Sequence, residues 1–361
     1  MEQSMVDAPV LSVVIPTWNR ATMVEEAVES AIAQDCPEFI EIIVVDDDST
    51  DETQAVLADL GRRRSPTNRL LRILHTDHCG RTGAAQRGID VASAPYAAIL
   101  GSDDAWEPQR ARELLTEQRR LGGNALIYTN TKEANACGVV ISDEPACVRL
   151  SGMAALSPGW QTDPFPLRSL VTSVFSANAF PYPACVAIFP THMLTGRFSL
   201  PQGIPSPDFW FLIAGHLQCV VAYLDTFSMR RRIHSGQQHR LAEAHLCHGE
   251  VDEQIRLSTA VISLLEDTVP QESAMISVMK YRLQLVLLRR GTLQGNRLTC
   301  LTGSVSMARH ALRFPGLWRT IASNILLALW PRLHDFVRYY PRRRRLALAI
   351  RQEHLQDGRS S

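Results

Sequence analysis

Two carboxylate-rich segments stand where apolar runs end, and their residue types are suited to chemistry. Asp46, Asp47 and Asp48 follow the run 40–45, and Gly101-Ser102-Asp103-Asp104 follows the run 96–100. Carboxylate oxygens are preferred ligands of Mg²⁺ and Mn²⁺, and such ions usually also bind substrate phosphates. The second segment therefore predicts a divalent-cation site for a phosphate-bearing substrate. The alternative is a helix cap, because an Asp before a helix accepts hydrogen bonds from free backbone N–H groups.

Short apolar runs predict the strands that position these groups. The runs at 10–15, 40–45, 70–74 and 96–100 are typical of buried strands in a parallel sheet, and further strands are predicted at 125–130 and 220–224. Apolar residues at helical spacing predict helices over 23–32, 55–60 and 110–121. Repeated strand–helix units predict an α/β fold with a mainly parallel sheet, in which ligands bind at the carboxyl ends of the strands.

Two further segments follow predicted strands. The first predicted strand leads into Pro16-Thr17-Trp18-Asn19-Arg20. The third leads into the segment Gly80–Gly88, which contains Arg81 and Arg87 and predicts a small-residue loop entering a helix. Backbone N–H groups and Arg side chains in such a loop can approach a phosphate, although the glycine spacing is not that of a known nucleotide fingerprint.

In their order and spacing, segments 14–20, 43–51 and 100–106 resemble the nucleotide-sugar domain of family 2 glycosyltransferases, which have the GT-A fold. The resemblance covers about residues 10–240. It implies that a Mg²⁺ or Mn²⁺ ion binds at Asp103 and Asp104, against the diphosphate of a UDP-, dTDP- or GDP-sugar. The other donor-binding residues that it implies are Pro16, Thr17, Asn19, Arg20, Asp46, Asp47 and Ser102, with Arg81 and Arg87 as candidates for the phosphates.

Two later segments extend the resemblance. The segment 206–212 resembles the family's Glu-Asp-Trp stretch, which implies that Asp208 is the general base for the acceptor hydroxyl in an inverting transfer. The alternative role for Asp208 is a helix N-cap. The segment 229–238 resembles the family's Tyr-Arg-x-His-x-Gly stretch, which implies that His234 completes the metal or diphosphate site beside Arg230–Arg232. A solvated basic turn is the alternative for these arginines.

The sequence departs from the family pattern at two positions. Gly101 stands where the family has the first Asp of Asp-Ser-Asp-Asp, and Ala85 stands where it has an Arg. The predicted function is an inverting, metal-dependent transfer of a sugar to a glycan, a lipid-linked acceptor or a small molecule. The alternatives are a catalytically impaired nucleotide-sugar-binding or scaffolding protein and, more weakly, a nucleotidyltransferase.

Composition and charge indicate which binding partners and which cellular compartment are expected. Lys and Arg together number 37, as do Asp and Glu, so the formal charge is zero and no nucleic-acid partner is expected. The eight cysteines form no CxxC pair, and no signal-peptide core follows the polar start, so a cytoplasmic location with reduced thiols is expected.

The pattern predicts four parts of the chain. These are a tail over 1–9, the GT-A domain over 10–245, a helical appendage over 246–341 and a basic tail over 342–361. Within the second part, the irregular stretch 137–203 is expected to hold an acceptor-binding loop with Trp160, Phe165, Phe175, Phe180 and Tyr182, or to bury these aromatic residues in the core. The stretch 317–345 carries Trp residues followed by arginines, which suits either peripheral contact with an anionic membrane or packing on the protein.

Overall fold

The computed structural model describes residues 8–143, 161–162, 185, 187–204, 207–234 and 248–271, with positions 276, 279, 280, 283, 286, 287 and 290. The chain divides into two compact units, one of residues 1–170 and 179–233 and the other of residues 171–178 and 234–361. The first unit contains the sheet and both carboxylate-rich segments. The five aromatic residues of the irregular stretch and the stretch 317–345 lie outside the described residues.

The first four strands alternate with helices, as predicted. Their apolar and β-branched runs bury β1 and β2 completely. One prediction is wrong: the segment 80–88 is not a loop but lies inside a helix, which begins directly at Gly80. The elements are β1 (Leu11–Thr17), α1 (Val24–Ile32), β2 (Ile40–Asp46), α2 (Thr53–Arg62), β3 (Arg69–His75), α3 (Gly80–Asp90) and β4 (Tyr96–Ile99).

The rest of the first unit contains shorter strands between two longer ones. The two longer strands, β6 and β10, begin where the apolar runs predict them. The elements are β5 (Ala105–Trp106), α4 (Arg110–Arg120), β6 (Ala125–Ala134), β7 (Val140–Ser142), β8 (Gln161–Thr162), β9 (Ala187–Pro190), two 3₁₀ turns (Thr191–Leu194 and Gly196–Phe198), α7 (Asp208–Gln218) and β10 (Val220–Arg232).

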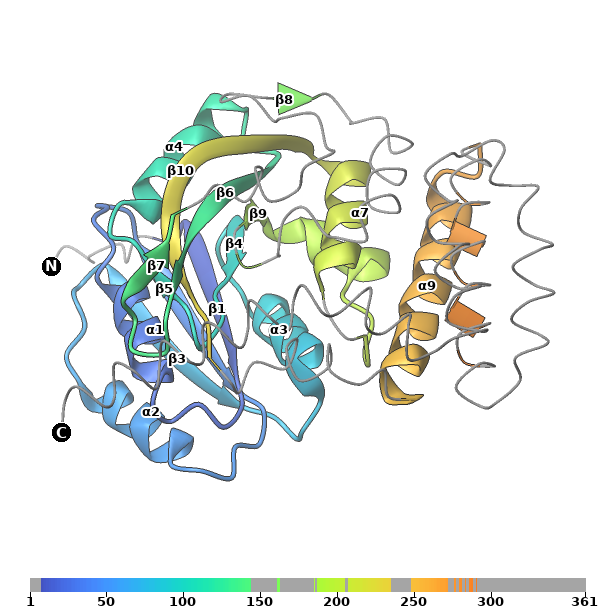
Figure 1. The fold of residues 1–361 in the computed structure, drawn as a ribbon. Helices are drawn as coiled ribbons and strands as arrows, with labels where there is room; N and C mark the ends of the chain where they lie inside the picture. The colour runs from blue at the N-terminus through green and yellow to red at the C-terminus, as the bar shows by residue number, and fades with distance from the viewer. Residues whose placement is uncertain are drawn as a thin grey trace, which may run out of the picture. The chain divides into compact units, whose positions relative to one another are not determined.

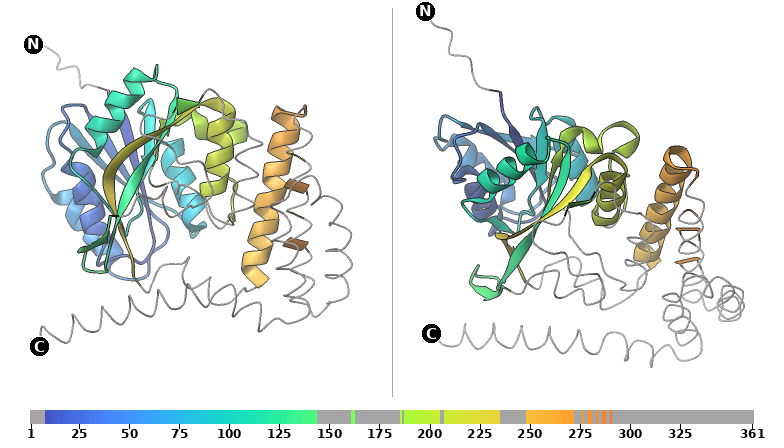
Figure 2. Two further views of the ribbon diagram at one scale, coloured as in Figure 1. Left: turned by 45° about the horizontal axis from the view of Figure 1, so that its top comes forward. Right: turned by 90° about the horizontal axis from the view of Figure 1, so that it is seen from above.

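All of these strands belong to one mixed sheet with the order β3-β2-β1-β4-β9-β6-β10-β5, in which β7 also pairs with β6 and β8 with β10. The pairs β2/β3, β1/β2, β1/β4 and β6/β10 are parallel, and β9 is antiparallel to both β4 and β6. Helices α1, α2 and α4 cover one face of the sheet and α3 and α7 cover the other (Figures 1 and 2). The mainly parallel α/β sheet predicted from the sequence is confirmed.

Two strands of this sheet differ from the sequence prediction. The irregular stretch contains β9, which is completely buried between β4 and β6. Strand β10 runs on through Arg230–Arg232, because these residues continue the parallel pairing with Lys132, Glu133 and Ala134 of β6. The arginines therefore lie on a strand, and the alternative of a basic turn is wrong.

In the second unit, the structure describes one long helix, α9 (His248–Thr268). Its buried apolar residues are Val251, Leu257, Val261, Ile262, Leu264 and Leu265. No helix among the described residues has the length and apolar character needed to cross a membrane.

Candidate active site

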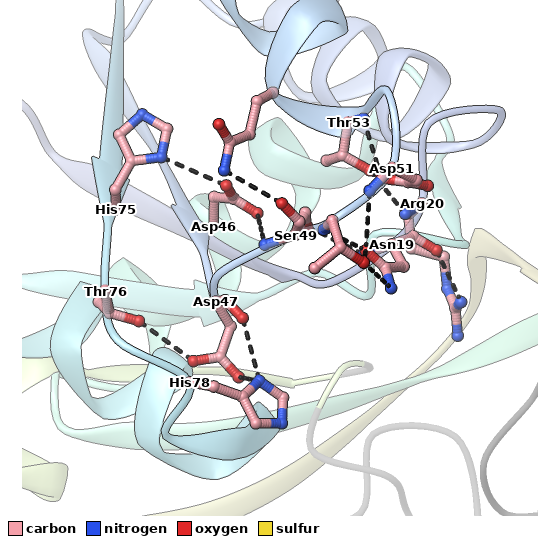
Figure 3. Close-up of polar contacts among 12 residues, drawn as sticks. Asn19, Arg20, Asp46, Asp47, Ser49, Asp51, Thr53, His75, Thr76 and His78 are labelled. Atoms are coloured by element: carbon pink, nitrogen blue, oxygen red, sulfur yellow. Dashed lines mark hydrogen bonds and ion pairs between the residues drawn. The ribbon is translucent and has the colours of Figure 1, made fainter.

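The paired carboxylates at the end of β2 are buried and hydrogen-bonded to neighbouring loops (Figure 3). Oδ1 of Asp47 accepts from the backbone N–H of Cys79 at 2.7 Å, and Oδ2 accepts from that of Gly80 at 2.9 Å. Asp46 accepts from the backbone N–H of Ser49 at 3.3 Å. These carboxylates therefore fix the loop after β2 and the start of α3 at the carboxyl edge of the sheet.

Two exposed histidines lie beside this pair, and sequence reasoning did not single them out. Nδ1 of His75 lies 3.2 Å from Oδ2 of Asp46, and Nδ1 of His78 lies 3.2 Å from Oδ2 of Asp47. The ring of His78 also contacts that of Trp18, with ring centroids 5.1 Å apart. Trp18 is 40% exposed, which is unusual for so large an apolar side chain. The predicted nucleoside site thus has an exposed aromatic surface.

The loop after β1 is joined to the loop after β2. Oδ1 of Asn19 accepts from the backbone N–H of Thr50 at 2.8 Å, and the backbone N–H of Asn19 donates to Ser49. Asn19 adopts a left-handed conformation, with φ of 51°, which Asn tolerates better than most residues. The backbone N–H of Arg20 donates to Oγ1 of Thr53 at 2.8 Å. Asn19 is therefore a structural link between the loops in this structure.

The two residues that precede this loop, Pro16 and Thr17, are buried at the carboxyl end of β1. Pro16 and Thr17 are the last two residues of β1. Oγ1 of Thr17 is buried and has no hydrogen-bond partner among the described residues. Such a group needs a partner, because leaving a buried hydroxyl unpaired costs about 1–3 kcal/mol.

The segment after β4 brings two carboxylates together over Gly101. Oδ2 of Asp104 and Oδ1 of Asp103 lie 2.8 Å and 2.9 Å from the point that a Cβ atom at Gly101 would occupy. Two carboxylate oxygens that face one small space form a donor set suited to a hard divalent cation. Gly101 has no side chain where the family has a carboxylate, and the carboxylates of Asp103 and Asp104 lie against the space that a side chain there would fill. Ser102, between Gly101 and Asp103 in the sequence, is buried.

The electrostatics of this segment agree with a cation site. Burial and the neighbouring charge of Asp103 raise the pKa of the Asp104 carboxyl to about 7. The backbone N–H of Arg232 donates to Oδ1 of Asp104 at 2.9 Å, and the charges of Arg231 and Arg232 oppose the rise in pKa. A cation next to both carboxylates would offset their repulsion.

The predicted base lies at the start of α7. The helix begins with Asp208, the cap position is Pro207, and that cap makes no side-chain hydrogen bond. The N-cap alternative for Asp208 is therefore not what the structure shows. Helix α3 holds the segment before α7 in place, because Oγ1 of Thr82 donates to the carbonyl of Ile204 at 3.1 Å.

Cys185, which sequence reasoning did not single out, lies among the predicted site residues. Burial raises the pKa of its thiol, and the charges of Asp104 and Asp208 raise it further, while Arg231 and Arg81 lower it. The structure therefore brings the predicted base, a predicted metal ligand and one predicted phosphate-binding Arg into electrostatic range of a single side chain. A cysteine between charged groups has no distinctive spacing in the sequence, so no pattern could have identified it.

Arg87 and His234 are the remaining predicted site residues. Arg87 is exposed in the last turn of α3, well past Arg81 at the start of the helix. His234 is buried two residues after β10. Among the described residues, no three His, Cys, Asp or Glu side chains form a metal-binding group. The assignment of Asp103, Asp104 and His234 as metal ligands therefore stays a prediction.

The fold and this edge of the sheet define a GT-A glycosyltransferase fold. The structure is similar to that of Staphylococcus aureus TarS 1–349 in complex with UDP-GlcNAc, with a TM-score of 0.53, 15% identity, and coverage of 89% of this chain and 81% of that one. It is also similar to the Pyrobaculum calidifontis mannosyltransferase in complex with GDP-Man and Mn²⁺, with a TM-score of 0.50, 15% identity, and coverage of 90% and 88%.

Sequence comparison finds a family match for part of the chain. Residues 12–136 match the model of glycosyl transferase family 2. The chain is 28% identical over 149 residues to the putative colanic acid biosynthesis glycosyl transferase WcaA of Escherichia coli, covering 40% of this chain and 50% of that protein. It is 32% identical over 119 residues to the succinoglycan biosynthesis protein ExoO of Rhizobium meliloti, covering 33% and 32%. The chain therefore spans half or less of the length of these relatives.

Proposed function

We propose that this chain is an inverting, divalent-cation-dependent glycosyltransferase that moves a sugar from a nucleoside-diphosphate sugar to an acceptor hydroxyl. The observation that carries the proposal is the pair of carboxylates converging over Gly101, with Asp208 near the same cysteine as Asp104. The family match and the similarity to structures solved with UDP-GlcNAc and GDP-Man support the donor class.

Each group has a distinct part in the proposed transfer. Asp208 accepts the proton of the acceptor hydroxyl, the hydroxyl oxygen bonds to the anomeric carbon, and the nucleoside diphosphate leaves. Asp103 and Asp104 would hold the Mg²⁺ or Mn²⁺ ion, which supplies positive charge to the leaving diphosphate when bound. Arg81 and Arg231 add positive charge at the same edge.

Relatives suggest the acceptor class. One relative, 36% identical over 97 residues, is a Campylobacter jejuni β-1,3-glucosyltransferase named for a GalNAc(5)-diNAcBac-PP-undecaprenol substrate; the match covers 27% of this chain and 30% of that protein. The WcaA and ExoO relatives are named for colanic acid and succinoglycan biosynthesis. These names favour a growing glycan, including one on a lipid carrier, as the acceptor.

A nucleotide-sugar panel with and without Mn²⁺ tests the donor and the cation together. A donor that binds the folded chain raises its Tm, and the proposal expects this rise to require the cation. Donor hydrolysis or transfer is then measured as release of the nucleoside diphosphate.

Asp103→Asn is expected to abolish the Mn²⁺-dependent rise in Tm. Asp35→Asn is the matched control, because Asp35 is exposed and pairs only with Arg112 among the described residues. Mn²⁺-dependent UDP binding without UDP release under any acceptor would instead show a binding protein. Pyrophosphate release would show a nucleotidyltransferase.

A further inference from the structure

Arg110 is a completely buried cation in the first turn of α4. Its Nη1 donates to Oγ1 of Thr129 at 2.9 Å and also to Oγ of Ser228. Its Nε and Nη2 have no hydrogen-bond partner among the described residues, and no carboxylate in that part of the chain forms an ion pair with it. Buried charges are normally paired, so an unpaired guanidinium needs an explanation.

The hydrogen bonds to Thr129 and Ser228 alone do not explain why position 110 is an arginine. The two hydroxyl acceptors also bond to each other, with 2.7 Å between Oγ1 of Thr129 and Oγ of Ser228. They therefore do not depend on Arg110 for a partner. Burial lowers the pKa of Arg110 to about 10, so the group remains charged at neutral pH. An apolar side chain of similar length in this position would avoid the desolvation of a charge.

The surroundings of Arg110 connect it to the candidate active site. Its guanidinium lies 4.9 Å from the centroid of the Trp106 ring. Trp106 belongs to β5, two residues after Asp104, and it pairs with Met229 of β10. The backbone N–H of Glu107 donates to the carbonyl of Ser228 at 2.9 Å. Arg110 thus contacts β5, β6 and β10 where the three strands meet.

The same strands carry the groups of the proposed cation and diphosphate site. Asp104 precedes β5 directly, and its Oδ1 accepts from the backbone N–H of Arg232 at the end of β10. A rotation or slip of β5 against β10 would separate these two residues. The guanidinium of Arg110 packs on Trp106 of β5 and is hydrogen-bonded to β6 and β10, so it resists that movement.

We infer that Arg110 is a positioning residue for the transfer reaction, which holds the Asp103–Asp104 turn in register with Arg230–Arg232. This inference rests on the proposed function. A group that positions catalytic residues can affect ligand binding strongly without contacting the ligand, since a displacement of about 1 Å can cost roughly a hundredfold.

The test compares Arg110→Met with Arg112→Met, an exposed Arg on the same helix that pairs with Asp35. Arg110→Met is expected to keep or raise the Tm, because a buried unpaired charge is removed. It is also expected to weaken Mn²⁺-dependent UDP binding by about tenfold or more in calorimetry. Arg112→Met is expected to leave UDP binding unchanged. Arg110→Lys, which keeps the charge and can reach the hydroxyls, is expected to recover most of the affinity.

A second readout does not depend on nucleotide binding. Hydrogen exchange of the Arg232 amide reports its bond to Asp104, and Arg110→Met is expected to accelerate it while the amides of β1 and β2 exchange as before. If Arg110→Met does not fold, Ser228→Ala removes one hydrogen-bond acceptor and is expected to accelerate the same amide. Unchanged Arg232 exchange together with unchanged UDP affinity refutes the inference. Faster exchange in a protein that binds no nucleotide shows that Arg110 holds the Asp103–Asp104 turn in register with β10, but it refutes the proposed function and with it a role of Arg110 in transfer.

Discussion

Gly101→Ala tests whether the missing side chain at position 101 is part of the site. The added Cβ would lie 2.8 Å from Oδ2 of Asp104 and 2.9 Å from Oδ1 of Asp103, about half an ångström inside ordinary contact. Asp104 has little freedom to move away, because it is buried and its Oδ1 accepts from the backbone N–H of Arg232. Overpacking of this kind costs about 1–3 kcal/mol.

The expected result is therefore a lower Tm, by roughly 2–4 °C for each kcal/mol in a domain of this size, and weaker Mn²⁺-dependent UDP binding. Thermal denaturation and calorimetry with Mn²⁺ measure the two effects. Gly101→Asp, which restores the family's residue, is expected to lose more stability than the alanine variant, because its side chain is larger.

Gly61→Ala is the matched control for this prediction. Gly61 lies in α2, where a Cβ would meet only Cδ1 of Ile73, at 3.3 Å. Alanine favours a helix over glycine by about 1 kcal/mol, so the Tm should not fall and UDP binding should not change. If Gly101→Ala binds Mn²⁺ and UDP as well as the parent chain, at the same Tm, the two carboxylates do not share that space.

Three further substitutions test other parts of the structure. Asp208→Asn should preserve donor affinity in calorimetry and abolish transfer, and an active variant would exclude Asp208 as the base. Asp47→Asn should cost about 1–3 kcal/mol in chemical denaturation, because one of the N–H groups of Cys79 and Gly80 loses its acceptor; equal stability would contradict the hydrogen bonding described for α3. For Glu41, burial raises the pKa, but hydrogen bonds from serine and arginine groups outweigh it and hold the pKa below 4.5. The carboxylate therefore stabilises the fold above that pH, and this contribution is lost as the pH falls through the lower folded-state pKa. Urea denaturation should show Glu41→Gln less stable at pH 7, with the difference shrinking in acid; a constant difference would refute the assignment.

The parallel core was predictable because each of its strands has a recognisable pattern in its own stretch of sequence. The runs that form β1, β2, β3 and β4 are apolar, short and bounded by turn residues, and each ends where the structure places a loop. The strand β9 carries no such signal, because its four residues follow a long irregular stretch and gain their hydrogen bonds only from β4 and β6. Non-local pairing of this kind cannot be read from the periodicity of a segment.

The site was predictable as a set of residue types but not as an arrangement. Asp104 and Asp208 each stand at a recognisable element boundary, yet their proximity to Cys185 depends on packing between distant segments. Asn19 was expected at the nucleotide, whereas its side chain accepts from the backbone of Thr50 in the structure. A motif shows that a residue type is needed at a position, and it does not separate binding a ligand from holding a loop.

The place of β9 in the sheet also constrains how this chain folds. Strands β4 and β6 are separated by β9, so the sheet of residues 12–136 is completed only when residues 187–190 are available. During synthesis, the edges of β4 and β6 that pair with β9 therefore stay unpaired until about fifty residues after position 136 have been added. Unpaired strand edges are sites of aggregation. Expression of residues 12–136 alone would leave both edges unpaired, so we expect the segment that matches the family model to aggregate more readily than the longer chain.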